Sequence, residues 1–78
     1  MDPIMGMVYV FAGNFAPEGY LICDGQLLQI SQNSALFSIL GTTYGGDGKT
    51  TFALPKIAAP IPGSNYVISV RGIYPSRP

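Results

Sequence analysis

The chain is short of the residues on which most enzymatic and metal sites depend. Its 78 residues include no histidine, no tryptophan and a single cysteine, Cys23. One cysteine cannot form a disulfide within the chain. Without histidine, Cys23 has no imidazole to activate it, and a structural zinc site would lack most of its usual ligands. The sequence therefore predicts a protein that is not an enzyme, with no catalytic residue, cofactor or metal ion.

Charged residues are also scarce. Four basic and four acidic residues make up 10% of the chain and give a formal net charge of zero, whereas 47% of the residues are hydrophobic. Roughly a quarter of the residues of a typical domain are charged. A balanced charge offers no basic surface to nucleic acid, so no nucleic-acid partner is expected. Because so short a chain leaves much of its apolar surface outside, the shortage of charge favours a subunit that is covered by copies of itself.

Long apolar segments are absent as well. No run approaches the roughly 18 apolar residues of a membrane-spanning helix, so no membrane span is predicted. The start of the sequence, Met-Asp-Pro-Ile-Met-Gly, has neither a basic region nor an apolar core, and no signal peptide is expected there.

Glycine and proline, by contrast, are frequent, with 10 and 7 residues respectively. This composition favours short strands separated by turns over long helices. β-Branched and aromatic residues predict strands at 7–11, 50–54 and 65–71. Residues 20–23 and 26–30 flank Asp24-Gly25, a pair that is typical of tight turns, so we predict a β-hairpin between them.

One short helix is expected after the hairpin. Ser31 is placed to cap its first turn, and apolar residues recur at helical spacing through Leu36, Phe37, Ile39 and Leu40. Gly41 follows where a left-handed residue ends many helices. The elements together predict an α+β, mainly β fold. Residues 1–56 would form the body of one domain, 57–64 a Pro/Gly connector, and 65–78 a strand and tail that complete the same domain.

The glycine-rich loop around Asp47 superficially resembles a phosphate-binding loop because Gly48-Lys49-Thr50 would close that motif. The first glycine of the motif would fall at Thr43, and the loop follows a helix instead of preceding one. A structural loop therefore explains the pattern better than nucleotide binding, and the position of Asp47 beside glycine is typical of turns.

Aromatic and apolar residues on the strands suggest contact surfaces. Both faces of residues 7–11 are apolar, so this strand is either buried on both sides or contacts another chain on one side. The residues that we expect at an assembly interface are Met7, Tyr9 and Phe11 on the first strand and Tyr66, Ile68 and Val70 on the last. Tyr44, Asp47 and Tyr74 form an alternative surface, since tyrosine also stacks against sugar rings.

Four stretches resemble a known family. They are Gly6-Met-Val-Tyr-Val-Phe-Ala-Gly-Asn-Phe-Ala-Pro17, Gly19-Tyr-Leu-Ile-Cys-Asp-Gly-Gln26, Ile30-Ser-Gln-Asn-Ser-Ala-Leu-Phe37 and Leu40-Gly-Thr-Thr-Tyr-Gly-Gly-Asp-Gly-Lys-Thr-Thr-Phe-Ala-Leu-Pro55. Over these residues the chain is similar to the phage tail collar domain of short tail fibres and of bacterial tail-like proteins. The resemblance implies a small β-rich domain with a structural role in trimeric fibres.

The sequence departs from the family pattern in two places that bear on function. Met7 and Tyr9 stand where the family usually has Glu and Arg, so a polar face of the first strand has become apolar. The long segment that usually separates the collar from its C-terminal strand is missing, which is consistent with a minimal collar protein without a tip. Both departures favour assembly over receptor binding.

Two hypotheses about function follow. In the first, the protein is a structural subunit that self-assembles into a trimeric or homopolymeric fibre, in a virion tail or at the cell surface, with copies of itself as its partners. In the second, it is an adhesin module of a phage tail that binds a receptor or a cell-surface glycan. Contact with baseplate or other tail proteins is compatible with either hypothesis.

Overall fold

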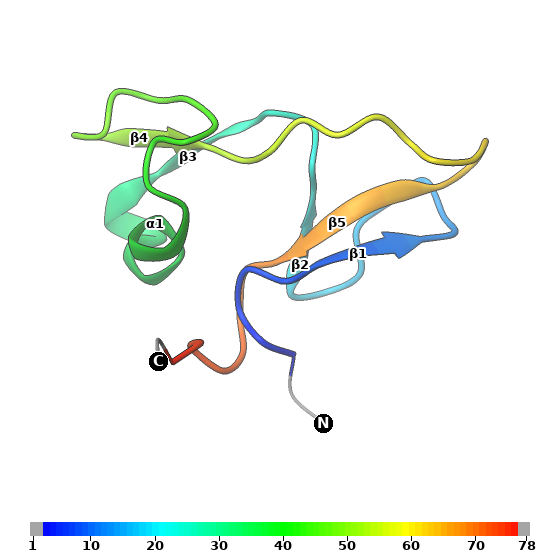
Figure 1. Cartoon of the computed structure of the whole chain (residues 1–78), viewed down its shortest axis with the longest axis horizontal. Helices are drawn as coiled ribbons and strands as arrows, with labels where there is room; N and C mark the ends of the chain where they lie inside the picture. The colour runs from blue at the N-terminus through cyan, green and yellow to red at the C-terminus, as the bar shows by residue number, and fades with distance from the viewer. Residues whose placement is uncertain (1–2, 77–78) are drawn as a thin grey trace.

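Two small antiparallel sheets and one helix make up the fold, as a computed structural model shows for residues 3–76 (Figure 1). The first sheet contains three strands, β1 (Val8–Phe11), β2 (Tyr20–Ile22) and β5 (Asn65–Ser69). The second contains β3 (Leu27–Gln29) and β4 (Thr51–Ala53). Between β3 and β4 lie a 3-10 turn, η1 (Ile30–Gln32), and the helix α1 (Ser34–Leu40). The α+β, mainly β fold class is confirmed.

The centre of the first sheet is β5, from the C-terminal part of the chain. β1 pairs with one edge of β5 and β2 with the other, both antiparallel. Val8 lies opposite Ile68 on one side, and Leu21 lies opposite the same residue on the other. β1 and β2 are therefore the two outer strands, and each forms its backbone pairing with β5.

The predicted hairpin across Asp24-Gly25 is wrong, because its two strands belong to different sheets. β2 ends at Ile22 and pairs with β5, whereas β3 begins at Leu27 and pairs with β4. Gly25 does have a positive φ of 83°, but no other residue type within 3–76 has a positive φ, so Asp24 cannot supply the second positive angle of a type I′ turn. Instead, the Asp24 carboxylate accepts a hydrogen bond from the Gln26 N–H at 3.1 Å, and the segment carries the chain from one sheet to the other.

The helix begins later than predicted. Ser31 lies inside η1, and the residue before α1 is Asn33, whose side chain makes no capping bond to the helix. The Asn33 side-chain amide instead donates to the Gln29 carbonyl at 3.0 Å, which closes the preceding turn. The predicted helix end is confirmed, since Gly41 has a φ of 58° and its N–H donates to the Phe37 carbonyl at 2.7 Å.

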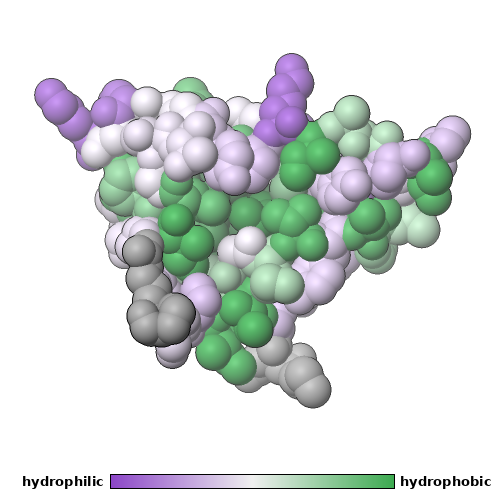
Figure 2. All heavy atoms as spheres, in the orientation of Figure 1, coloured by the Kyte–Doolittle hydropathy of each residue, from purple (hydrophilic) through white to green (hydrophobic). Residues whose placement is uncertain are grey.

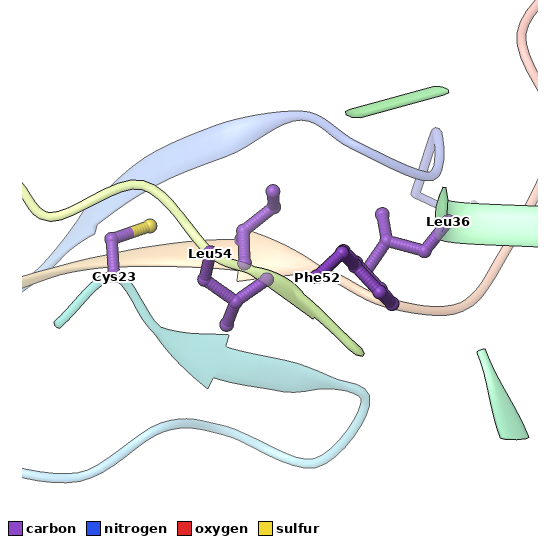
Figure 3. Close-up of a cluster of buried hydrophobic side chains, with 5 residues drawn as sticks. Cys23, Leu36, Phe52 and Leu54 are labelled. Atoms are coloured by element: carbon purple, nitrogen blue, oxygen red, sulfur yellow. The ribbon is translucent and has the colours of Figure 1, made fainter. Parts of the chain in front are cut away.

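A small apolar core joins the two sheets and the helix. Its buried residues come from the position just after β2, from α1, from β4 and its continuation, and from β5, namely Cys23, Leu36, Phe52, Leu54 and Ile68. Figure 3 shows these side chains extending from Cys23 past Leu54 and Phe52 to Leu36 on the helix. The rings of Phe37 and Phe52 lie 5.4 Å apart and join the helix to β4. α1, the longest helix within residues 3–76, has seven residues and is far too short to cross a bilayer.

Candidate assembly surface

β1 is an outer strand whose free edge carries unpaired backbone groups. At its start, Gly6 N–H donates to the Ser69 carbonyl at 2.8 Å, and Ser69 N–H donates to the Met7 carbonyl at 2.9 Å. Gly6 and Met7 thus face one residue of β5, which is a β-bulge. From this point the pairing with β5 is regular from Val8 to Phe11.

The register determines which backbone groups of β1 point outward. In an antiparallel pair, residues alternate between those that bond to the neighbouring strand and those that point away from it. Because Met7 bonds to β5, Tyr9 and Phe11 do so as well, and the N–H and C=O groups of Val8 and Val10 point to the free edge. No residue within 3–76 lies beyond β1 in the sheet to pair with them.

The edge formed by β2 is different, because local hydrogen bonds already occupy it. Tyr20 N–H donates to the Pro17 carbonyl at 3.0 Å. The Ile22 carbonyl accepts from Asp24 N–H at 3.0 Å and from the Gln26 side-chain amide at 3.1 Å. These contacts leave β1 as the more open of the two edges.

The side chains of β1 are apolar or aromatic, and three of the four are exposed. The exposed fraction is 37% for Val8, 41% for Tyr9 and 52% for Val10. No charged residue occurs between Pro3 and Pro17. Outer strands usually carry lysine or proline, which discourage pairing with other chains, and β1 carries neither. Figure 1 shows β1 alongside β5, and in Figure 2 hydrophobic residues spread across the face of the molecule seen in this view.

Aromatic contacts hold part of this surface in place. The Tyr9 ring meets the Tyr20 ring of β2 edge to face, with centroids 6.0 Å apart. Phe11 meets Phe15 in the same manner at 5.1 Å, and Phe15 remains 57% exposed. The predicted first-strand residues Met7, Tyr9 and Phe11 occupy alternate positions along this outer strand, and alternate residues share one face of a sheet.

The predicted contact residues of the last strand lie elsewhere. Ile68 has no exposed surface, because it lies in the core on the strand between β1 and β2. Tyr66 and Val70 pack against the same core. β5 is also occupied on both edges, so this strand cannot extend another sheet while it holds its own together. Of the two predicted strands, β1 is thus the one whose edge is open to a partner.

The loop residue Asp47 serves the loop itself. One of its carboxylate oxygens accepts from the N–H groups of Lys49, Thr50 and Thr51 at 2.8–2.9 Å, and the other accepts from the Thr50 hydroxyl at 2.8 Å. These bonds stabilise the charged form, and they hold the pKa of Asp47 well below its usual value. The loop leaves no room for a side chain at Gly46, because a Cβ atom there would lie 2.4 Å from the Cα atom of Phe52.

The other two residues of the possible glycan surface are exposed, but each has a separate setting. Tyr44 lies in the loop after α1 and is half exposed. The Tyr74 hydroxyl shares a hydrogen bond of 2.5 Å with the Ser38 hydroxyl on α1. Because the Asp47 carboxylate is bonded to its own loop, little of it is left for a sugar. Glycan binding by these residues stays a prediction.

The lone thiol is buried and poorly suited to chemistry. Cys23 is 2% exposed in the core, and burial, with a smaller contribution from the charge of Asp24, raises its pKa. A raised pKa keeps sulfur as the unreactive thiol. Within residues 3–76, no three acidic, histidine or cysteine side chains lie together as they would at a metal site.

Sequence comparison gives the family. The profile of the phage tail collar domain matches residues 6–62, nearly three quarters of the chain. The protein belongs to the phage tail collar domain family, and membership indicates a structural component of a phage tail fibre. A search of curated proteins finds no significant match.

Sequence reasoning identified the side chains of the first strand but missed the backbone of Val8 and Val10. Which edge of β1 is free depends on the position of β5, which lies more than fifty residues later in the chain. The available signal was indirect: an apolar strand without charge or proline is unusual at an exposed edge.

Proposed function

We propose that this collar protein is a structural subunit that assembles with copies of itself into a fibre, as a trimer or a longer homopolymer. The observation that carries the proposal is the free edge of β1, with outward-pointing backbone groups at Val8 and Val10 and exposed apolar side chains. A strand of another chain that pairs with this edge would satisfy these groups. The same pairing would remove the exposed apolar side chains of β1 from water.

The composition supports assembly over an independent particle. The net charge is zero, which favours association of copies because there is no net repulsion between them. Within the described residues, the one ion pair joins Arg71 to Glu18 at 3.8 Å, and both side chains are largely exposed. Such a pair contributes little to stability or to recognition. Contacts between copies would therefore be mainly apolar and backbone in character, in a virion tail or in a related extracellular fibre.

The test is a charge placed on the free edge. Val10→Lys puts an ammonium group at a site that is 52% exposed and that is not among the residues packed against the core cluster. We expect the variant to fold and to lose self-association, because the charge would have to be buried at the contact. Ile61→Lys is a matched control, since Ile61 is 56% exposed on the connector and lies outside all strands.

Sedimentation velocity and electron microscopy would report assembly, and circular dichroism would report the fold. The parent and Ile61→Lys should form the same assemblies, whereas Val10→Lys should sediment as smaller species. Assembly of Val10→Lys at the level of the parent would show that β1 is not the contact. A parent chain that stays monomeric at all concentrations would refute the proposal as a whole.

A further inference from the structure

The partner of β1 can be specified more closely from the positions of its free backbone groups. We infer that β1 pairs antiparallel with β1 of a second copy, about a two-fold axis at Tyr9. This inference rests on the proposed function, since both use the edge of β1. It adds the identity, direction and register of the pairing strand.

The first argument is the complementarity of the edge with itself. The outward N–H and C=O groups belong to Val8 and Val10, on either side of Tyr9. When two copies meet antiparallel with Tyr9 opposite Tyr9, Val8 of each copy faces Val10 of the other. Both residues then exchange N–H···O=C bonds, as hydrogen-bonded pairs do in an antiparallel ladder. All four outward groups of each strand are satisfied.

Other two-fold registers do not achieve this. An axis at Val8 would place Val10 opposite Gly6, whose N–H already donates to Ser69 within the bulge. An axis at Val10 would place Val8 opposite Ala12, which lies beyond the end of β1. The bulge at one end and the strand end at the other thus select the register centred on Tyr9.

The second argument is the character of the side chains that this register brings together. Met7 faces Phe11 of the second copy, and Tyr9 faces its counterpart, all on one face of the combined sheet. Val8 faces Val10 on the other face. Every pair is apolar or aromatic, and such cross-strand pairs stabilise sheets. No like charges are brought together, because no residue between Pro3 and Pro17 is charged.

The result is one sheet of six strands in the order β2-β5-β1-β1-β5-β2. A two-fold contact is closed, because it uses the same surface of both copies. Such a pair is a repeating unit for a homopolymer and does not fit a threefold ring built on β1. A longer fibre would then grow through a second surface of the pair.

Cysteine cross-linking tests the register directly. In the two-fold pair, the Cα atoms of the two Tyr9 residues would be about 4.5 Å apart, as for a non-hydrogen-bonded pair, which is within the roughly 4.4–6.8 Å of disulfides. Tyr9→Cys should therefore form a disulfide dimer under mild oxidation with oxidised glutathione. Ile61→Cys is the control, because Ile61 is 56% exposed but lies on the connector, outside β1. The parent chain, whose one cysteine Cys23 is buried, gives the background level of disulfide dimer.

A second set of variants leaves Tyr9 and its contact with Tyr20 intact. Val8→Cys alone and Val10→Cys alone should give no more dimer than Ile61→Cys, whereas a mixture of the two should form the mixed disulfide. Cross-linking of either valine variant alone at the level of the mixture would overturn the register.

The outcomes separate the inference from the proposed function. If the parent assembles in sedimentation velocity but neither Tyr9→Cys nor the mixture exceeds the control, the two-fold pairing is wrong and assembly through another contact stands. If the parent stays monomeric at every concentration, the proposed function fails and the pairing fails with it. Dimer formation by Tyr9→Cys and by the mixture, without either valine variant alone, supports the inference.

Discussion

Replacing Ile68 by valine separates the role of this residue in the core from a role in assembly. Ile68 lies on the central strand β5, between Val8 and Leu21 on the two outer strands, and none of its surface is exposed. Ile68→Val removes one buried methylene group and leaves a small cavity. Such a change typically costs about 0.5–1.5 kcal/mol of the free energy of unfolding.

The expected loss is large compared with the total. A chain of 78 residues at roughly 0.05–0.15 kcal/mol per residue has a free energy of unfolding of about 4–12 kcal/mol. For a domain of this size, a change of 1 kcal/mol shifts Tm by about 4–8 °C. A loss near 1 kcal/mol is therefore measurable by urea titration followed by circular dichroism, at a concentration at which the protein is monomeric.

Ile73→Val is the matched control, because it makes the same chemical change at a residue that is 55% exposed. We expect its effect to stay within about 0.5 kcal/mol of the parent. Both variants should assemble as the parent does in sedimentation velocity, apart from any loss of folded protein. If Ile68→Val left the urea midpoint unchanged and weakened assembly, Ile68 would lie at a contact between copies and the core described above would be wrong.

Three further outcomes are expected. Backbone hydrogen bonds depress the pKa of Asp47, so the stability that its carboxylate contributes is complete above the usual carboxyl pKa and is lost as the pH falls through the lower pKa of the folded state. Carbon-13 NMR titration of the carboxyl group would refute this if Asp47 titrated at or above 3.8. Gly46→Ala should destabilise the protein by more than about 1 kcal/mol, because the φ of 93° at this position is strained for alanine and the new Cβ atom would meet the backbone of Phe52. An unchanged midpoint of urea unfolding would contradict this prediction. The Cys23 thiol should react with a thiol reagent only as fast as the protein unfolds, and a reaction as fast as that of a free thiol would show that the residue is accessible.

The strands were predictable because their signal is local. Alternating apolar and β-branched residues predicted segments that contain β1, β4 and β5, and Gly41 marked the end of the helix. Strand pairing was not predictable, since it depends on partners distant in the sequence. Asp24-Gly25 illustrates the difference: the pair is typical of a hairpin, but β5 provides a longer and more buried partner for β2 than β3 could.

The assembly surface was predictable only in part, for the same reason. The apolar character of Met7, Tyr9 and Phe11 could be read directly from the sequence. The burial of Ile68 and the free backbone of Val8 and Val10 both follow from the central position of β5. An alternating apolar strand reads the same whether it ends up in the centre of a sheet or at its edge, and only the order of the strands decides.

β5 also lies outside the region that matches the family profile, which ends at residue 62. A chain that ended after Gly63 would retain nearly everything that identifies it as a collar domain and would lose the strand that joins β1 to β2. It would lose the fully buried side chains of Val67 and Ile68, worth about 1.5–3 kcal/mol each, together with both hydrogen-bonded ladders. These losses are comparable with the whole free energy of unfolding, about 4–12 kcal/mol.

We therefore expect the shortened chain to be unfolded in its first sheet, with loss of the near-ultraviolet circular dichroism of Tyr9 and Tyr20, whose rings are in contact. Adding a synthetic peptide of residues 64–76 should restore the signal, because β5 would pair with both outer strands from a separate molecule. A peptide in which Ile68 is replaced by lysine is the control and should not restore it. If the shortened chain kept the tyrosine signal without any peptide, β1 and β2 would have found another partner, and the central role of β5 would be refuted.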